Sequence, residues 1–255
     1  MTHSPPAAPP ASMSGDDEAA AVKRALAWTH TARFLTTASK LAELPVSELP
    51  EIAFVGRSNA GKSTAINVLT QQKRLAFASK TPGRTQHINL FEVGPKLAPD
   101  ALFADLPGYG YAAVERSAKL RWQEVMAEYL AVRRSLSAIV VLVDARLGFT
   151  EIDLKLLGFV TPRIANGSVK LLVLLTKADK LNRSETADAL RRASDLLGDM
   201  TSAEADVSLA AFSALSRAGV GDAARVLHEW VHAAHGGASQ APVAGSALPP
   251  GMSHL

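Results

Sequence analysis

Apolar runs and helical patterns alternate along most of this chain. Short, nearly continuous apolar runs are typical of strands buried on both faces, and they occupy residues 52–55, 87–93, 101–105, 138–143, 170–175 and 207–212. Apolar residues at helical spacing fall between most of these runs and predict helices over 62–71, 113–134, 151–164, 185–197 and 220–234. The alternation predicts an α/β domain in which helices cover both faces of a mostly parallel sheet.

One connection departs from this rhythm. Only residues 94–100 join the run at 87–93 to the run at 101–105, and this segment is too short for a crossover helix. Those two strands should therefore pair antiparallel. We expect a mostly parallel six-stranded sheet with one antiparallel strand.

Both ends of the chain lack the apolar periodicity of a packed element. Residues 1–20 are rich in Pro, Ala and Ser, and residues 236–255 have a similar character. Such segments bury too little apolar surface to offset the entropy of ordering them. We expect disordered tails at 1–20 and 236–255 on either side of a single domain over 21–235, which begins with an N-terminal extension.

Composition sets modest bounds on function. With 255 residues, of which 47% are hydrophobic, the chain can bury a sizeable core. The absence of cysteine excludes disulfides and Cys-based zinc sites. A net charge of +3 permits an anionic partner without requiring one. No apolar run approaches the roughly 18 residues of a membrane span, and no secretory signal is recognisable, so we expect a cytoplasmic protein without a membrane partner.

A glycine-rich loop separates the first apolar run from the first helical segment. It is a complete GxxxxGK[ST] motif made of Gly56, Arg57, Ser58, Asn59, Ala60, Gly61, Lys62 and Ser63. Backbone N–H groups of such a loop surround phosphate oxygens, and the following helix adds its positive dipole end. Lys62 would reach the β- and γ-phosphates, and the Ser63 hydroxyl can ligate Mg²⁺.

A second candidate loop follows the apolar run at 101–105. It reads Asp105, Leu106, Pro107 and Gly108, at the end of a strand where open α/β sheets bind ligands. Asp105 can hold Mg²⁺ directly or through a water. The Gly108 N–H can approach a γ-phosphate closely because glycine has no side chain in the way.

A third candidate loop follows the run at 170–175 and reads Thr176, Lys177, Ala178 and Asp179. The Asp179 carboxylate can accept both N1–H and N2–H of guanine, and adenine offers no such donor pair. The pattern therefore favours GTP over ATP, with Lys177 lying across the base. Thr176 stands where guanine-binding loops often have Asn. After the last run, the Ala214 N–H beside Ser213 could contact guanine O6.

A basic segment lies between the first helix and the second strand. Its cations are Lys73, Arg74, Lys80 and Arg84, with no acidic residue from 73 to 86. Pro and Gly without apolar periodicity predict a mobile loop here. Two interpretations remain open, a solvated basic loop and a switch that faces RNA.

A threonine in such a loop can close onto Mg²⁺ while a γ-phosphate is present and release it after hydrolysis. We favour Thr85 over Thr81, because Thr85 follows Gly83 and lies nearer the next strand.

Four stretches of the sequence together resemble the EngB family of ribosome-biogenesis GTPases, within the TrmE–Era–EngA–EngB superfamily. They are GRSNAGKS at 56–63, KTPGRTQ at 80–86, DLPGYGYA at 105–112 and LLTKADKL at 174–181. The resemblance implies a Ras-like P-loop G domain that binds GTP with Mg²⁺ and hydrolyses it to GDP and phosphate. It also implies action in assembly of the large ribosomal subunit, through rRNA or ribosomal proteins, and a requirement for normal division-septum formation.

The same resemblance implies roles for individual residues. Ser63 and Thr85 would be the Mg²⁺ ligands. Besides the phosphate loop, the residues implied to line the nucleotide are Gly83, Arg84, Thr85, Gln86, His87, Asp105, Leu106, Pro107, Gly108, Thr176, Lys177, Ala178, Asp179, Phe212, Ser213 and Ala214. Separately from the resemblance, we expect a monomer with no DNA partner.

Two positions bear on hydrolysis. Ras-type GTPases place a water-orienting Gln after the DxxG glycine, and Tyr109 stands there in this chain. We therefore expect slow intrinsic turnover in which Lys62, Thr85 and Gly108 act on the γ-phosphate. Asn59 resembles the Asn that coordinates K⁺ in several superfamily members, so K⁺ could act like an arginine finger.

Three functions are alternatives to a GTP-hydrolysing switch. His228, Glu229 and His232 match the HExxH zinc pattern, with His235 one turn later, but they lie beside the predicted apolar face of the last helix, so we favour a packing role. A GTP-controlled RNA-binding module without turnover would keep the fold and lose the catalysis. An ATP-using P-loop kinase is disfavoured by Asp179.

Overall fold

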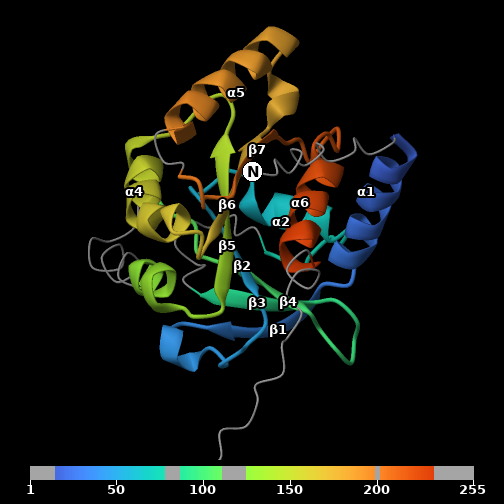
Figure 1. Cartoon of the computed structure of the whole chain (residues 1–255), viewed down its shortest axis with the longest axis vertical. Coiled ribbons are helices and arrows are strands. Elements are labelled where there is room, and N and C mark those ends of the chain that lie inside the picture. The colour runs from blue at the N-terminus through green and yellow to red at the C-terminus, as the bar shows by residue number, and fades with distance from the viewer. Residues whose placement is uncertain (1–14, 78–86, 111–124, 199–201, 233–255) are drawn as a thin grey trace, which may run out of the picture.

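The computed structural model describes residues 15–77, 87–110, 125–198 and 202–232 (Figure 1). Its helices are α1 (Gly15–Thr29), α2 (Lys62–Leu69), α4 (Glu151–Ala165), α5 (Arg183–Gly198) and α6 (Val220–His232), and residues 125–132 are also helical. Its strands are β1 (Arg33–Ala38), β2 (Glu51–Gly56), β3 (Ile88–Val93), β4 (Ala101–Asp105), β5 (Leu136–Asp144), β6 (Lys170–Thr176) and β7 (Val207–Ala211). The predicted helix at 113–134 is thus helical over 125–132, and residues 111–124 lie outside the described ranges.

The strands form one sheet in the order β1-β3-β4-β2-β5-β6-β7. β3 runs against both of its neighbours, and the other pairs are parallel. The predicted α/β class, with a mostly parallel sheet and one antiparallel strand, is confirmed. The carboxyl ends of β2, β4, β5 and β6 consequently meet at one edge, where such sheets bind ligands.

The sheet has seven strands rather than the six we expect from sequence. The additional strand, β1, pairs antiparallel with β3 at the edge and carries an irregularity between Phe34 and Thr36. Phe34 and Leu35 are both exposed, so the strand lacks the buried run or clean alternation that would have predicted it.

A helix also begins earlier than the expected tail boundary at residue 20. α1 starts at Gly15, with Asp16, Asp17 and Glu18 in its first turn, where acidic groups favour the helix dipole. Its buried face packs along α6 through Ala25 and Trp28, which corrects the expectation for residues 15–20. Residues 1–14 and 233–255 lie outside the described part, so the disordered tails stay a prediction.

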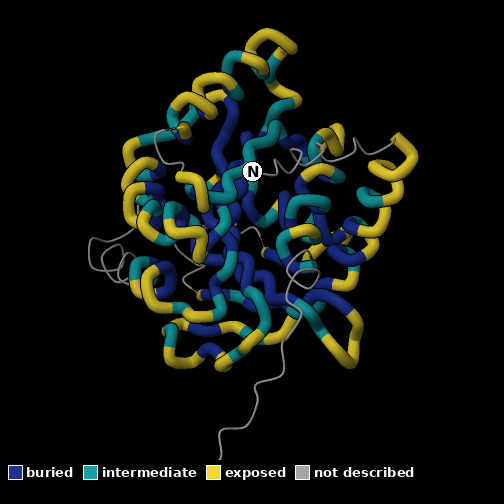
Figure 2. Tube along the Cα trace, viewed as in Figure 1, coloured by how far each residue is buried: buried dark blue, intermediate teal, exposed yellow. Residues whose placement is uncertain are grey.

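Successive residues of the central strands serve two cores, one on each face of the sheet. Helices lie on both sides of the sheet (Figure 1), and the tube is mostly buried along its centre (Figure 2). On one face, Val55 and Val141 pack with α4, α5 and the helical stretch at 125–132. On the other, Phe54 and Leu142 pack with α1, α2 and α6. The central strands are buried on both faces, as their apolar runs predict.

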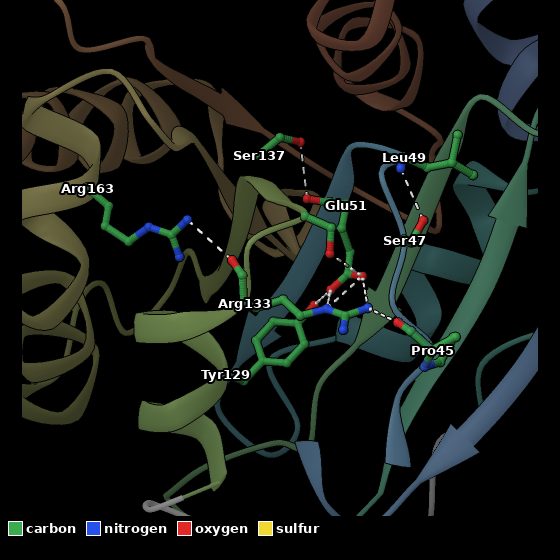
Figure 3. A network of polar contacts seen from close by, with 9 residues as sticks. Pro45, Ser47, Leu49, Glu51, Tyr129, Arg133, Ser137 and Arg163 are labelled. Atoms are coloured by element: carbon green, nitrogen blue, oxygen red, sulfur yellow. Dashed lines mark hydrogen bonds and ion pairs between the residues drawn. The ribbon is translucent and has the colours of Figure 1, made fainter. Parts of the chain in front are cut away.

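A buried polar network ties the helical stretch at 125–132 to the start of β2, at the sheet edge opposite the candidate site (Figure 3). Glu51 is fully buried and accepts a hydrogen bond from the Tyr129 hydroxyl. Arg133 Nη2 lies 2.8 Å from Glu51 Oε2 and also donates to the Pro45 carbonyl oxygen at 2.9 Å. Burial, followed by the nearby Glu51 charge, raises the pKa of Tyr129, which stays a neutral donor.

We expect Arg133→Met to lower the free energy of unfolding by about 3–5 kcal/mol, because it leaves the Glu51 carboxylate buried without its cation. Urea denaturation followed by circular dichroism measures this change. The double variant Glu51→Gln/Arg133→Met should recover much of the loss, since neither charge remains. A double variant as unstable as the single one would contradict this account of the network.

Candidate nucleotide-binding site

The phosphate loop turns sharply between β2 and α2. Gly61 has a φ of +91°, in the left-handed region that glycine occupies without strain, and it directly precedes Lys62 at the start of α2. Asn59 also lies in this region, with a φ of +69°. The loop therefore presents backbone N–H groups at a helix N-terminus, which is the arrangement that binds phosphate.

Lys62 and Asp105 meet across this loop. The Lys62 ammonium forms an ion pair with Asp105 Oδ1, and both side chains are buried. β4 pairs with β2 so that Asp105 lies opposite Phe54, which brings its carboxylate to the loop. Ser63 Oγ lies 3.5 Å from the Phe77 carbonyl oxygen, a weak contact. The oxygens of Ser63 and Asp105 are of the type that Mg²⁺ prefers.

The loop after β4 lies directly against the phosphate loop. Ser58 N donates to the Tyr109 carbonyl oxygen at 2.8 Å, and Tyr109 N donates to the Gly56 carbonyl oxygen at 3.2 Å. A Cβ atom on Gly108 would come within 3.3 Å of Ser58 N. Glycine at 108 therefore allows this close approach without a shift of Ser58.

The Tyr109 side chain joins this loop to the start of α4. It is almost fully buried, and its hydroxyl donates to Asp153 Oδ1 at 2.7 Å. Asp153 Oδ2 in turn accepts from the backbone N–H of Thr150 at 2.8 Å, at the start of α4. Burial, followed by the Asp153 charge, raises the pKa of Tyr109. This side chain therefore anchors its loop to α4.

The loop after β6 is joined to the phosphate loop by two side chains. Lys177, with a φ of +58°, donates from Nζ to the Asn59 carbonyl oxygen at 2.7 Å. The buried Thr176 hydroxyl donates to the Ala60 carbonyl oxygen at 2.6 Å. Thr176 thus makes the bridge between the two loops with a hydroxyl.

The loop after β7 supports the same region. Ala178 N donates to the Phe212 carbonyl oxygen at 3.2 Å, and Ser213 Oγ donates to Asp179 Oδ1 at 2.7 Å. The Ser213 hydrogen bond is the main reason that the pKa of the Asp179 carboxyl lies below its ordinary value. Asp179 is therefore held ionised, as an acceptor-only group.

Some of the other predicted site residues lie outside the described ranges. Gly83, Arg84, Thr85 and Gln86 fall in the gap at 78–86, so the proposed threonine switch stays a prediction. His87, immediately before β3, is described, and its Nδ1 lies 2.8 Å from Ser39 Oγ in a hydrogen bond. Leu106 is buried, and Pro107 lies between it and Gly108.

The residues of the HExxH match are engaged in packing and ion pairing. The His228 and His232 rings stack at 4.0 Å between centroids, and His232 Nε2 lies 3.1 Å from Asp100 Oδ2. Glu229 pairs with Arg225 at 2.7 Å. Over the described ranges, no group of three or more His, Asp or Glu residues is placed to hold a metal ion, and His235 lies beyond them. The packing role that we favour for these histidines agrees with this geometry.

Sequence reasoning missed Asp144, Arg146 and Asp153, which line a cleft of about 200 Å³ beside the phosphate loop together with Ser58, Asn59 and Lys177. Asp144 follows an apolar run at the carboxyl end of β5, so the rule that placed Asp105 at the site could also have found it.

In the described part of the chain, no helix has the length and apolarity to cross a bilayer.

Comparisons with known proteins show a family match and similar curated proteins. A family model described as "50S ribosome-binding GTPase" matches residues 51–177. Among curated proteins, a "Probable GTP-binding protein EngB" of Acidovorax ebreus (strain TPSY) is 60% identical over 81% of this chain and 91% of its own length. The protein of the same name from Polaromonas sp. (strain JS666 / ATCC BAA-500) is 56% identical over 91% of both chains.

Solved structures support the fold. A crystal structure titled as a probable GTP-binding protein engB aligns with a TM-score of 0.51 and 20% identity, over 72% of this chain and 99% of that one. Era in complex with MgGDPNP and a segment of 16S ribosomal RNA aligns with a TM-score of 0.55 and 18% identity, over 80% of this chain and 60% of that one. The high identity to curated relatives over most of their length establishes that the chain belongs to the EngB family of GTP-binding proteins and carries a GTPase domain.

Proposed function

We propose that this GTPase is a guanine-nucleotide switch that binds Mg²⁺–GTP, hydrolyses it slowly and acts in assembly of the large ribosomal subunit. The observation that carries the nucleotide part is the meeting of three loops at the carboxyl edge of the sheet. Lys62 pairs with Asp105, and Lys177 contacts Asn59, so the loops after β2, β4 and β6 are joined side by side. This arrangement supports one site with a phosphate end at Lys62 and a guanine end at Asp179.

The protein groups support hydrolysis chiefly through charge. The Lys62 ammonium and the N–H groups of the phosphate loop would stabilise charge that develops on the γ-phosphoryl oxygens. Mg²⁺, when bound, would supply further positive charge, and Ser63 and Thr85 are its proposed ligands, with Asp105 placed to act directly or through water. Loss of the γ-phosphate would release Thr85 and Gly108 and relax the switch loops. Tyr109 has no side-chain amide to orient a water, and its hydroxyl is already bound to Asp153.

We expect K⁺ to replace the missing catalytic group, with the Asn59 side chain as its ligand. Turnover in KCl should exceed turnover in NaCl at equal ionic strength by roughly tenfold or more, a fraction of what an arginine finger supplies. Asn59→Gly should abolish the difference, and glycine accepts the positive φ at this position without strain. Phosphate release in each salt measures the effect, and equal wild-type turnover in KCl and NaCl would contradict the K⁺ hypothesis.

The ribosomal part of the proposal rests on the EngB resemblance, supported by the description of the matching family model. We expect the protein to co-sediment with purified large ribosomal subunits when it is loaded with a non-hydrolysable GTP analogue, and much less when it is loaded with GDP. A steep loss of binding with added salt would identify contacts to rRNA phosphates. Negligible pelleting in both nucleotide states would refute the ribosomal role and leave the GTPase domain intact.

Three further proposals remain. A requirement for normal division-septum formation follows from the EngB resemblance, and we also propose that the protein is cytoplasmic and monomeric. Depletion in cells followed by microscopy of septa, together with sedimentation of the purified protein, tests them.

A further inference from the structure

Asp144 is the last residue of β5 and lies beside the phosphate loop, outside the sequence motifs at 56–63, 105–108 and 176–179. Its side chain is only 7% exposed, yet it meets two cations. Arg146 donates from Nε to Oδ1 at 2.9 Å and from Nη2 to Oδ2 at 2.7 Å, a two-pronged contact. Lys177 Nζ donates to Oδ2 at 2.8 Å.

The Lys177 ammonium is therefore fixed between two elements. One of its hydrogen bonds goes to Asp144 at the end of β5, and another goes to the Asn59 carbonyl oxygen of the phosphate loop at 2.7 Å. The Lys177 backbone also holds a positive φ, which a residue with a side chain adopts only when its surroundings enforce it. The position of the lysine stem is thus set at both of its ends.

Arg146 stabilises the ionised form of Asp144. Its hydrogen bonds, with those of Lys177, hold the pKa of Asp144 well below the ordinary value despite burial. The backbone N–H of Arg146 also donates to Oδ1 at 3.1 Å. Both carboxylate oxygens are therefore used, and the group has little freedom to turn away from Lys177.

We propose that Asp144, clamped by Arg146, is a positioning residue that holds Lys177 where its stem forms one wall of the purine site and its ammonium braces the phosphate loop. This inference rests on the proposed guanine-nucleotide site and assigns it a residue outside its sequence motifs. Asp144 acts only through Lys177 and does not touch the nucleotide. Its loss should weaken binding of every purine nucleotide that packs against the lysine, whereas Asp179 selects among purines.

The test compares Asp144→Asn with wild type, because the amide keeps the shape of the side chain and removes its charge. We expect the Kd values for GDP, IDP and XDP all to rise by a similar factor of about tenfold, so that the ratios between them do not change. In steady-state hydrolysis KM should rise in step while kcat stays within about twofold. The matched control is Asp188→Asn, which removes a carboxylate from an exposed pair with Arg191 on α5 and should change nothing.

A double-mutant cycle separates positioning from a general loss of structure. In a Lys177→Met background, Asp144→Asn should raise the Kd for GDP by less than about twofold, because the group it positions is gone. A full tenfold effect in that background, or an unchanged Kd in Asp144→Asn alone, would overturn the proposal. If wild-type protein fails to bind GDP, the proposed nucleotide site itself fails, an outcome distinct from both.

Discussion

Lys62→Met should reduce the rate constant for GTP hydrolysis by about 10²–10³-fold, equivalent to about 3–4 kcal/mol of transition-state stabilisation. Lys62 lies at the start of α2, behind the left-handed turn at Gly61, where its ammonium can follow charge onto the γ-phosphoryl oxygens. Methionine keeps most of the stem and removes the charge. Single-turnover hydrolysis with enzyme in excess separates this loss from weaker binding.

The ion pair with Asp105 complicates this variant. Removing the ammonium leaves a buried carboxylate without its cation, which should also lower stability. The double variant Lys62→Met/Asp105→Asn should recover the free energy of unfolding, and its hydrolysis should stay below that of Asp105→Asn alone, which accounts for the loss of a group placed to hold Mg²⁺. If hydrolysis returned together with stability, Lys62 would have only a structural role.

Asp179→Asn should weaken GTP binding by about 10²–10⁴-fold, because hydrogen bonds to a charged acceptor contribute about 1.5–3 kcal/mol each. The Asn Oδ1 can still accept one of the two guanine N–H groups, but without charge, and Nδ2 can accept neither. Xanthosine nucleotides carry a carbonyl where guanine has its exocyclic amine, so the Asn amide can donate to them. The variant should therefore bind XTP more tightly than GTP. Competition against a fluorescent guanine nucleotide measures the reversal.

Ser213→Ala should affect the same guanine contact more weakly than Asp179→Asn. It keeps the Asp179 carboxylate but removes the hydrogen bond that chiefly lowers its pKa, so GTP affinity should fall modestly with guanine selectivity retained. An Asp179→Asn protein that still prefers GTP to XTP would show that the loop after β6 does not read the base.

The fold was largely accessible from sequence because its central strands are buried on both faces. Continuous apolar runs locate β2, β4, β5 and β6, and the short link at 94–100 predicts the reversed strand β3. β1 was not accessible, since Phe34 and Leu35 face solvent at the sheet edge. α1 was assigned in part to a tail, because its Ala-rich first turns show little apolar periodicity until it packs on α6.

Part of the candidate site could likewise be predicted from sequence, and part could not. The phosphate loop is visible in sequence because contiguous residues create its geometry. Asp144 and Asp153 are not, because single carboxylates gain a role only from partners such as Lys177 and Tyr109, which folding brings from 33 and 44 residues away. The Glu51–Arg133 pair, separated by 82 residues, is hidden for the same reason.

The most direct test of the account is a calorimetric titration of the wild-type protein with GTP analogue, GDP and ATP analogue in the presence of Mg²⁺. We predict one binding site per chain for the guanine nucleotides and at least about 100-fold weaker binding of the ATP analogue, because only guanine offers a donor pair to Asp179. Equal affinity for the adenine and guanine nucleotides would contradict the claim that the three loops form one guanine-specific site.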